Sequence, residues 1–82
     1  MKSKIEELQK RIDSLEGAIS DERTREHFLE LPGFWLGDAE RFIGNNQTEV
    51  AAEILKLVED QINAVEKIVL KYGRMVIIQG KG

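Results

Sequence analysis

Apolar residues recur at alternating intervals of three and four along two segments of the chain. The row near the start consists of Ile5, Leu8, Ile12, Leu15 and Ile19. The row near the end consists of Ala51, Leu55, Val58, Ile62, Val65, Val69 and Tyr72. This spacing places each row on one face of an α-helix, where it forms a seam for another helix. The pattern predicts an all-α protein.

The first long helix is expected over residues 3–31. Glu, Leu, Lys, Gln, Arg and Ile, which are good helix formers, dominate this segment. Ser3 and Glu6 stand at the interval of a capping box, which marks a helix start. Pro32 and Gly33 follow the segment and predict its end.

The seam of this first helix fails after Ile19. The next seam positions hold Glu22 and Glu26, which an apolar interface would not accept. The helix therefore either turns its face or breaks at this point. Gly17, which costs about 1 kcal/mol relative to Ala inside a helix, allows a bend between Gly17 and Asp21.

A short helix is predicted over residues 38–43. Asp38 is suited to its N-cap, and Gly44 is suited to a left-handed terminator. Asn45 and Asn46 are then expected to form a turn.

The last long helix is expected over residues 48–72. Asn46 and Glu49 have the capping-box interval, Thr48 is a competing cap, and Gly73 provides the stop. The whole chain then forms a helical hairpin, in which the last helix runs antiparallel to the first and the short helix lies between them.

The last helix carries a second apolar row beside its seam, made of Val50, Ile54, Leu57, Ala64 and Ile68. The first helix offers one narrow row that cannot cover both, and each Leu, Ile or Val left exposed forfeits about 1.5–3 kcal/mol. We therefore expect a homo-oligomeric helical bundle, a dimer or larger. Gln61 interrupts the second row, either as a buried polar residue that specifies register or as an edge residue in water.

The extended tail, residues 74–82, begins with a segment rich in β-branched residues. Val76, Ile77 and Ile78 break the helical period and are typical of a short strand. A single strand leaves its backbone unpaired, so it would pair with another copy or add to the sheet edge of a partner.

A cluster of large apolar residues surrounds the predicted stop at Pro32. Interface anchors are rich in aromatic residues, so the cluster is either a partner-binding surface or core at the open end of the hairpin. Core is favoured for Phe34, Leu36 and Phe42, whereas Trp35 fits either role.

Size and charge narrow the class of protein. The 82 residues make one small domain, for which sharing an apolar face with other chains is an efficient source of stability. A net charge of −3 with interspersed signs argues against a nucleic-acid partner. The sequence has no cysteine, no apolar run of membrane-spanning length and no signal-peptide pattern, so we expect a cytoplasmic protein without a membrane partner.

Candidate chemistry is sparse. His27 is the single histidine and the chain has no cysteine, so we expect no metal site, no cofactor and no catalytic residue. Arg23, Arg25 and Arg74 could bind an anion such as a nucleotide if an oligomer brought them together. Asp21, Glu22 and Glu26 stand close enough in sequence to neutralise the first two.

The sequence thus predicts a non-catalytic module for oligomerisation and protein–protein interaction, an adaptor, regulator or inhibitor of the bacterial or viral type. The predicted partner-binding residues are Val50, Ile54, Leu57, Ile68, Trp35, Val76, Ile77 and Ile78. The alternative function is sequestration of an anionic small ligand between subunits by the three arginines.

Overall fold

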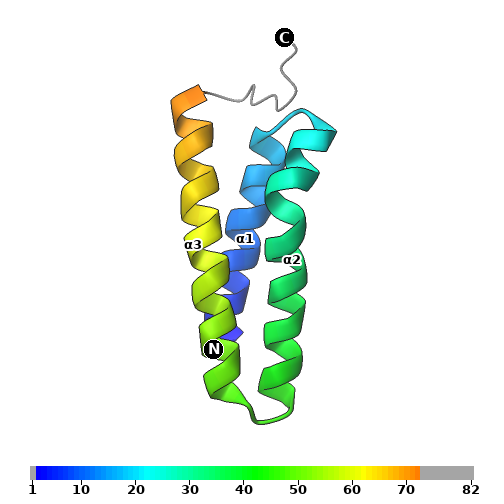
Figure 1. Cartoon of the computed structure of the whole chain (residues 1–82), viewed down its shortest axis with the longest axis vertical. Coiled ribbons are helices and arrows are strands. Elements are labelled where there is room, and N and C mark those ends of the chain that lie inside the picture. Colours follow the sequence, from blue (N-terminus) through cyan, green and yellow to red (C-terminus); the bar gives the residue numbers. More distant parts are fainter. Residues whose placement is uncertain (1, 73–82) are drawn as a thin grey trace.

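The computed structural model describes residues 2–72, which form three α-helices packed side by side (Figure 1). They are α1 (Lys2–Ala18), α2 (Glu22–Gly44) and α3 (Thr48–Tyr72). The all-α prediction is confirmed, and α3 has its predicted bounds. The predicted strand at residues 76–78 lies outside the described residues. None of the helices within residues 2–72 combines the length and apolar character needed to cross a membrane.

The predicted helix over residues 3–31 is wrong, because the chain breaks between Ala18 and Glu22. Asp21 is the N-cap of α2: its carboxylate accepts hydrogen bonds from the Thr24 backbone N–H at 2.9 Å and the Thr24 hydroxyl at 2.8 Å. Thr24 is fully buried, so the cap also closes one end of the core. Of the two alternatives at the failing seam, the break is the one observed.

The cap at Asp21 makes stability depend on pH. The hydrogen bond from the Thr24 side chain, followed by that from its backbone N–H, lowers the pKa of Asp21 below its ordinary value. A carboxylate with a lowered folded-state pKa stabilises the fold above its unfolded-state pKa, and this contribution disappears as the pH falls through the folded-state pKa. Asp21→Asn retains a capping side chain without the charge. We expect the urea midpoints of wild type and variant to differ most near neutral pH and to converge in acid; a constant difference would contradict this assignment.

The predicted separate helix over residues 38–43 is also wrong, because α2 continues through Pro32. A proline inside a helix costs about 3 kcal/mol relative to alanine. Here the ring is buried in the protein interior, and this burial offsets part of the cost. Asp38 consequently lies inside α2, where it pairs with Arg41 instead of capping a helix.

The additional long helix changes the direction of α3 relative to α1. The hairpin prediction made these two helices antiparallel. In the structure they are parallel, with α2 antiparallel to both (Figure 1). Two ion pairs reflect the parallel arrangement of α1 and α3. Lys4 contacts Glu59 and the later residue Arg11 contacts the correspondingly later residue Glu66.

The turn between α2 and α3 is a Schellman motif. The Gln47 N–H donates to the Phe42 carbonyl at 2.8 Å, and the Asn46 N–H donates to the Ile43 carbonyl at 3.0 Å. Asn46 carries the positive φ of the motif, 63°, so Asn46 and not Gly44 is the left-handed residue. The predicted turn at Asn45 and Asn46 is confirmed, and the predicted role of Gly44 is wrong.

The left-handed backbone at Asn46 yields a prediction about stability. Asn46→Gly should raise the free energy of unfolding by up to about 1 kcal/mol, because glycine adopts positive φ without strain. Asn46→Ala should lower it by about 1 kcal/mol, because a β-carbon disfavours this conformation. Urea unfolding measures both. The neighbouring Asn45, whose φ is −98°, is the matched control and should show no gain with glycine.

The core contains both predicted seams. All five residues of the seam from Ile5 to Ile19 are buried, as are all members of the α3 seam from Ala51 to Val65. Val69 is partly buried against them, and the side chain of Tyr72 lies outside the described set. Helix α2 contributes Leu29, Pro32, Leu36 and Ala39. This core occupies one side of α3. The second apolar row of α3, from Val50 to Ile68, lies on a different flank of the helix.

Candidate functional site

The position of the second row follows from the contacts between α1 and α3. Glu59, Asn63 and Glu66 reach Arg11 or Lys4 of α1, so they mark the flank of α3 that faces α1. Successive helical residues are rotated by about 100°, which puts the row from Val50 to Ile68 on the opposite flank of the core seam. That flank borders α2.

Helix α2 carries a matching row on the flank that lies nearest to α3. Its α1 side is marked by Glu40, Ile43 and Gly44, which line a surface groove of about 340 Å³ together with Lys2, Ile5 and Glu6 of α1. The same rotation places a row on its α3 side that also alternates intervals of four and three. This row consists of Thr24, Phe28, Leu31, Trp35, Asp38 and Phe42.

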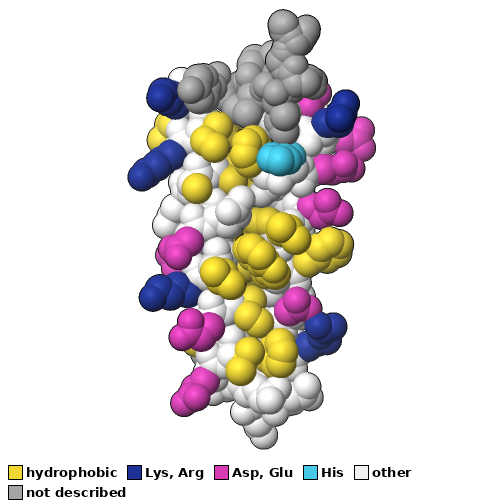
Figure 2. Space-filling view, viewed as in Figure 1, with side chains coloured by type: hydrophobic (Ala, Val, Ile, Leu, Met, Phe, Trp, Pro, Cys, Tyr) yellow, Lys and Arg dark blue, Asp and Glu magenta, His cyan; other side chains and the backbone are white. Residues whose placement is uncertain are grey.

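The two rows and Phe34 at their rim make one surface, which we call the α2–α3 face. Figure 2 shows apolar side chains gathered on the side formed by α2 and α3, with charged side chains along both edges. Its large apolar members are Phe28, Leu31, Phe34, Trp35, Phe42, Val50, Ile54, Leu57 and Ile68. This face is the candidate functional site.

Four members of the α2–α3 face are strongly exposed. The exposed fractions are 56% for Leu31, 61% for Phe34, 42% for Val50 and 53% for Leu57. Trp35 is half-buried against the core. Of the residues predicted to bind a partner, two are thus open to solvent, and three, Trp35, Ile54 and Ile68, are half-covered by the chain itself.

The sequence prediction misjudged one aromatic residue of this face and missed an aliphatic one. Leu36 is buried and Phe42 is partly buried, as core residues should be. Phe34 is exposed, so its assignment to the core is wrong. A helix end at Pro32 leaves Leu31 outside any row, whereas the observed helix continues through Pro32 and puts Leu31 in the same row as Trp35.

Gln61 interrupts the α3 row of the α2–α3 face near its middle. Its side chain is half-buried. It therefore matches neither alternative fully, being neither enclosed in the core nor freely solvated at an edge.

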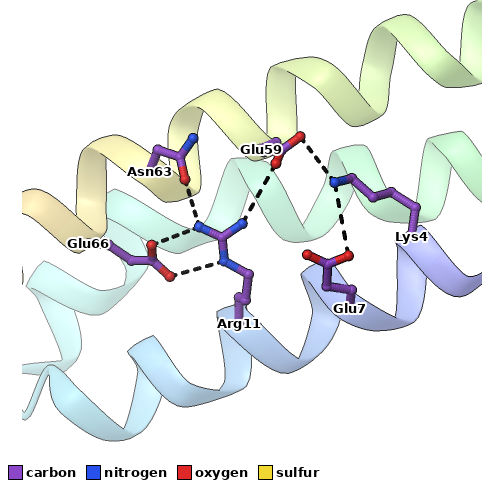
Figure 3. A network of polar contacts seen from close by, with 6 residues as sticks. All are labelled: Lys4, Glu7, Arg11, Glu59, Asn63 and Glu66. Carbon is purple, nitrogen blue, oxygen red and sulfur yellow. Dashed lines mark hydrogen bonds and ion pairs between the residues drawn. The ribbon is translucent and has the colours of Figure 1, made fainter.

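A polar network on another side of the molecule joins α1 to α3 (Figure 3). The Arg11 guanidinium donates to both carboxylate oxygens of Glu66, at 3.1 and 2.7 Å, and to Asn63 at 2.6 Å. Glu59 lies 3.9 Å from Arg11 and 3.2 Å from Lys4. The hydrogen bond with Glu66 is the main cause that raises the pKa of Arg11 above its ordinary value. Each of these contacts joins side chains of the chain itself, so the network holds α1 against α3.

Arg11→Ala is expected to lower the free energy of unfolding by about 1 kcal/mol or less, because the ion pairs are partly exposed to water. Arg11→Lys should recover part of the loss, since lysine keeps the charge but not the paired geometry. The exposed neighbour Lys10 is the matched control. Urea unfolding at low and high salt measures the effect, which should shrink with salt. A loss independent of salt would indicate packing instead.

The proposed anion-binding arginines differ in their surroundings. Arg25 is half-buried and donates to the Ile19 carbonyl at 3.0 Å, where it secures the α1–α2 connection. Arg23 is exposed, and Arg74 lies outside the described residues. His27 is exposed, and its ring meets that of Phe28 edge-on at 5.2 Å. Of the two described arginines, one is thus engaged with the backbone of its own chain and the other faces solvent.

Metal-binding groups and similarity to known proteins are the remaining sources of evidence on function. Within residues 2–72, no group of three or more His, Asp or Glu side chains is placed to hold a metal ion. No protein-family model matches the sequence, and searches of curated proteins and of solved structures gave no match. The α2–α3 face thus has to be interpreted from its own geometry.

Proposed function

We propose that this protein is a non-catalytic interaction module that binds a helical surface of another polypeptide chain through the α2–α3 face. The observation that supports this most directly is the exposure of four large apolar side chains, Leu31, Phe34, Val50 and Leu57, on one side of the bundle.

The size of the exposed surface supports a binding role. The four side chains expose about 400 Å² together, which is the scale of functional patches on monomeric proteins. Burying that area at about 25 cal/mol per Å² contributes roughly 10 kcal/mol of binding free energy. This contribution is comparable to the roughly 4–15 kcal/mol that association costs in lost translational and rotational freedom. Apolar surface contributed by the partner would supply the surplus.

The spacing of the face favours a helical partner. Both rows alternate intervals of three and four, which is the pattern that accepts side chains of a facing helix between its own. A strand would present side chains every second residue and would not match this repeat. The α2–α3 face is therefore suited to one amphipathic helix or to a pair of helices.

Other parts of the predicted function remain proposals. Whether the module acts as an adaptor, a regulator or an inhibitor depends on its partner. A cytoplasmic location agrees with a sequence that lacks cysteine. Anion sequestration by the arginines remains an alternative prediction, which no contact among the described residues favours.

Selection from a library of displayed amphipathic helices tests the proposed function. Wild-type protein should enrich helices with apolar residues at i, i+3, i+4 and i+7. The double variant Leu31→Ser/Leu57→Ser should bind them at least tenfold more weakly, while its circular dichroism stays helical. Glu16→Ser, exposed on α1, is the matched control.

The result is interpreted together with the molar mass in solution. A monomeric wild type that enriches no helix would refute the proposed function. A self-associated wild type that enriches none would support the proposed function only if Leu31→Ser/Leu57→Ser makes the protein monomeric; self-association that survives this double variant would also refute it.

A further inference from the structure

We propose that the occupant of the α2–α3 face is a second copy of this chain, packed antiparallel across a two-fold axis perpendicular to the helices. This inference rests on the proposed function and names its partner. In the dimer, α2 lies against α2 and α3 against α3 of the other copy, so that four helices share one added apolar layer.

The positions of the two rows carry the inference. The α3 row of residues 50, 54, 57, 61, 64 and 68 is symmetric about position 59. The α2 row of residues 24, 28, 31, 35, 38 and 42 is symmetric about position 33. Each centre is 13 residues from Asn46 in the turn, so both lie at about the same height along the bundle. One two-fold axis therefore serves both rows.

This axis defines the contacts between copies. Val50 meets Ile68 of the other copy, and Leu57 meets Gln61. On α2, Leu31 meets Trp35 of the other copy. Every contact occurs twice, as an isologous interface requires. Three of the four exposed members of the face, Leu31, Val50 and Leu57, are thereby placed against half-buried members, which adds to the burial that a single chain provides.

Charge distribution favours the antiparallel arrangement. Near the α2–α3 turn the α3 edge of the face carries Glu49 and Glu53, while on α2 the row member Asp38 pairs with Arg41. At the opposite end the α3 edge carries Lys67 and Lys71, whereas the α2 edge carries Arg23 and Glu30, whose charges cancel. Antiparallel copies bring the acidic end of one against the basic end of the other, which lowers the energy of the complex. Parallel copies would instead bring Glu53 of one copy close to Asp38 of the other.

The area available is sufficient for a stable dimer. The 25 residues of α3 span about 38 Å, and two packed helices are about 20 Å wide. The face therefore covers roughly 750 Å², close to the 800 Å² that each partner contributes to a standard interface.

Single cysteines test the arrangement, because the natural chain contains none. Val50→Cys and Ile68→Cys are prepared separately and then mixed. In the proposed dimer, mild oxidation should cross-link the mixture and neither variant alone, because like positions lie about 27 Å apart along the axis. Light scattering of the wild type should give twice 9.4 kDa.

A charge exchange gives a second readout. Glu53→Lys and Lys67→Glu should each weaken dimerisation about tenfold, and mixing the two variants should restore it, because both contacts then join opposite charges. Glu16→Lys on the exposed side of α1 is the matched control and should leave the dimer unchanged.

Two results would overturn the inference. A mixture of Val50→Cys and Phe42→Cys that cross-links would show a parallel dimer, in which α3 of one copy faces α2 of the other, and it would leave the proposed function standing. A wild type that remains monomeric at millimolar concentration, with no cross-link in the mixture, would exclude the second copy as the occupant; the selection of displayed helices then decides the proposed function separately.

Discussion

Replacing Ile62 by Ala is expected to lower the free energy of unfolding by about 2–5 kcal/mol. Ile62 is fully buried in the middle of α3, within the core shared by all three helices. The substitution removes apolar contacts and leaves a cavity that rigid helices fill only in part. Small domains have about 5–15 kcal/mol of stability in total, so this one change should remove much of it.

Leu57→Ala is the matched control for this substitution. It removes a residue of similar size from the same helix, but Leu57 is 53% exposed and lies on the α2–α3 face. Under conditions in which the protein is monomeric, its effect should be below about 1 kcal/mol. Urea unfolding with constant slope measures both variants. Equal losses from Ile62→Ala and Leu57→Ala would show that the assignment of core and surface on α3 is incorrect.

Replacing Ala51 by Leu is expected to lower the free energy of unfolding by about 1–3 kcal/mol. Ala51 and Ala39 are both fully buried near the α2–α3 turn, where small side chains let the two helices approach closely. A leucine at position 51 forces the helices apart or into strained side-chain conformations. Thermal unfolding followed by circular dichroism measures the loss.

Ala52→Leu provides the comparison, since Ala52 is exposed on the same turn of α3. Both substitutions add the same side chain and have the same effect on helix propensity. We expect the Ala52 variant to unfold within about 0.5 kcal/mol of the wild type. A small effect at both positions would mean that the space beside Ala51 is larger than the described packing implies.

The apolar rows identified most of the core from sequence because helix periodicity determines which residues share a face. The five-residue row ending at Ile19 and the row beginning at Ala51 are both buried. The start of α3 at Thr48 was also predictable, since capping residues precede a long uninterrupted apolar pattern. These features depend on local spacing alone.

The helix boundaries in the middle of the chain depended on competing local signals. Asp21 and Thr24 form the cap that starts α2. Their spacing is a weak signal in the sequence, because several charged residues surround them. Pro32 was assigned to a helix end by its intrinsic preference, whereas burial of its ring in the tertiary structure overrides that preference. The continuous helix predicted across residues 18–22 and the helix end predicted at Pro32 together removed α2 from the prediction and reversed the direction of α3 relative to α1.

The candidate site was recovered in part for the same reason. Its α3 half follows from the second row, which needs only the periodicity of an uninterrupted helix. Its α2 half could not be assembled while residues 28–42 were divided between two helices and a corner. Continuing the alternation of four and three through Pro32 would have joined Leu31 to Trp35 and predicted the whole face.

The two rows of α3 lie on one helix but face different neighbours, which has a consequence for how the sequence can change over generations. Substitutions in the row of Val58 and Ile62 alter folding, because those side chains are enclosed by the chain's own helices. Substitutions in the row of Val50 and Leu57 leave the enclosed side chains untouched. Under the proposed function, selection can adjust what this face binds while the three-helix architecture is maintained, because separate residues determine binding and folding.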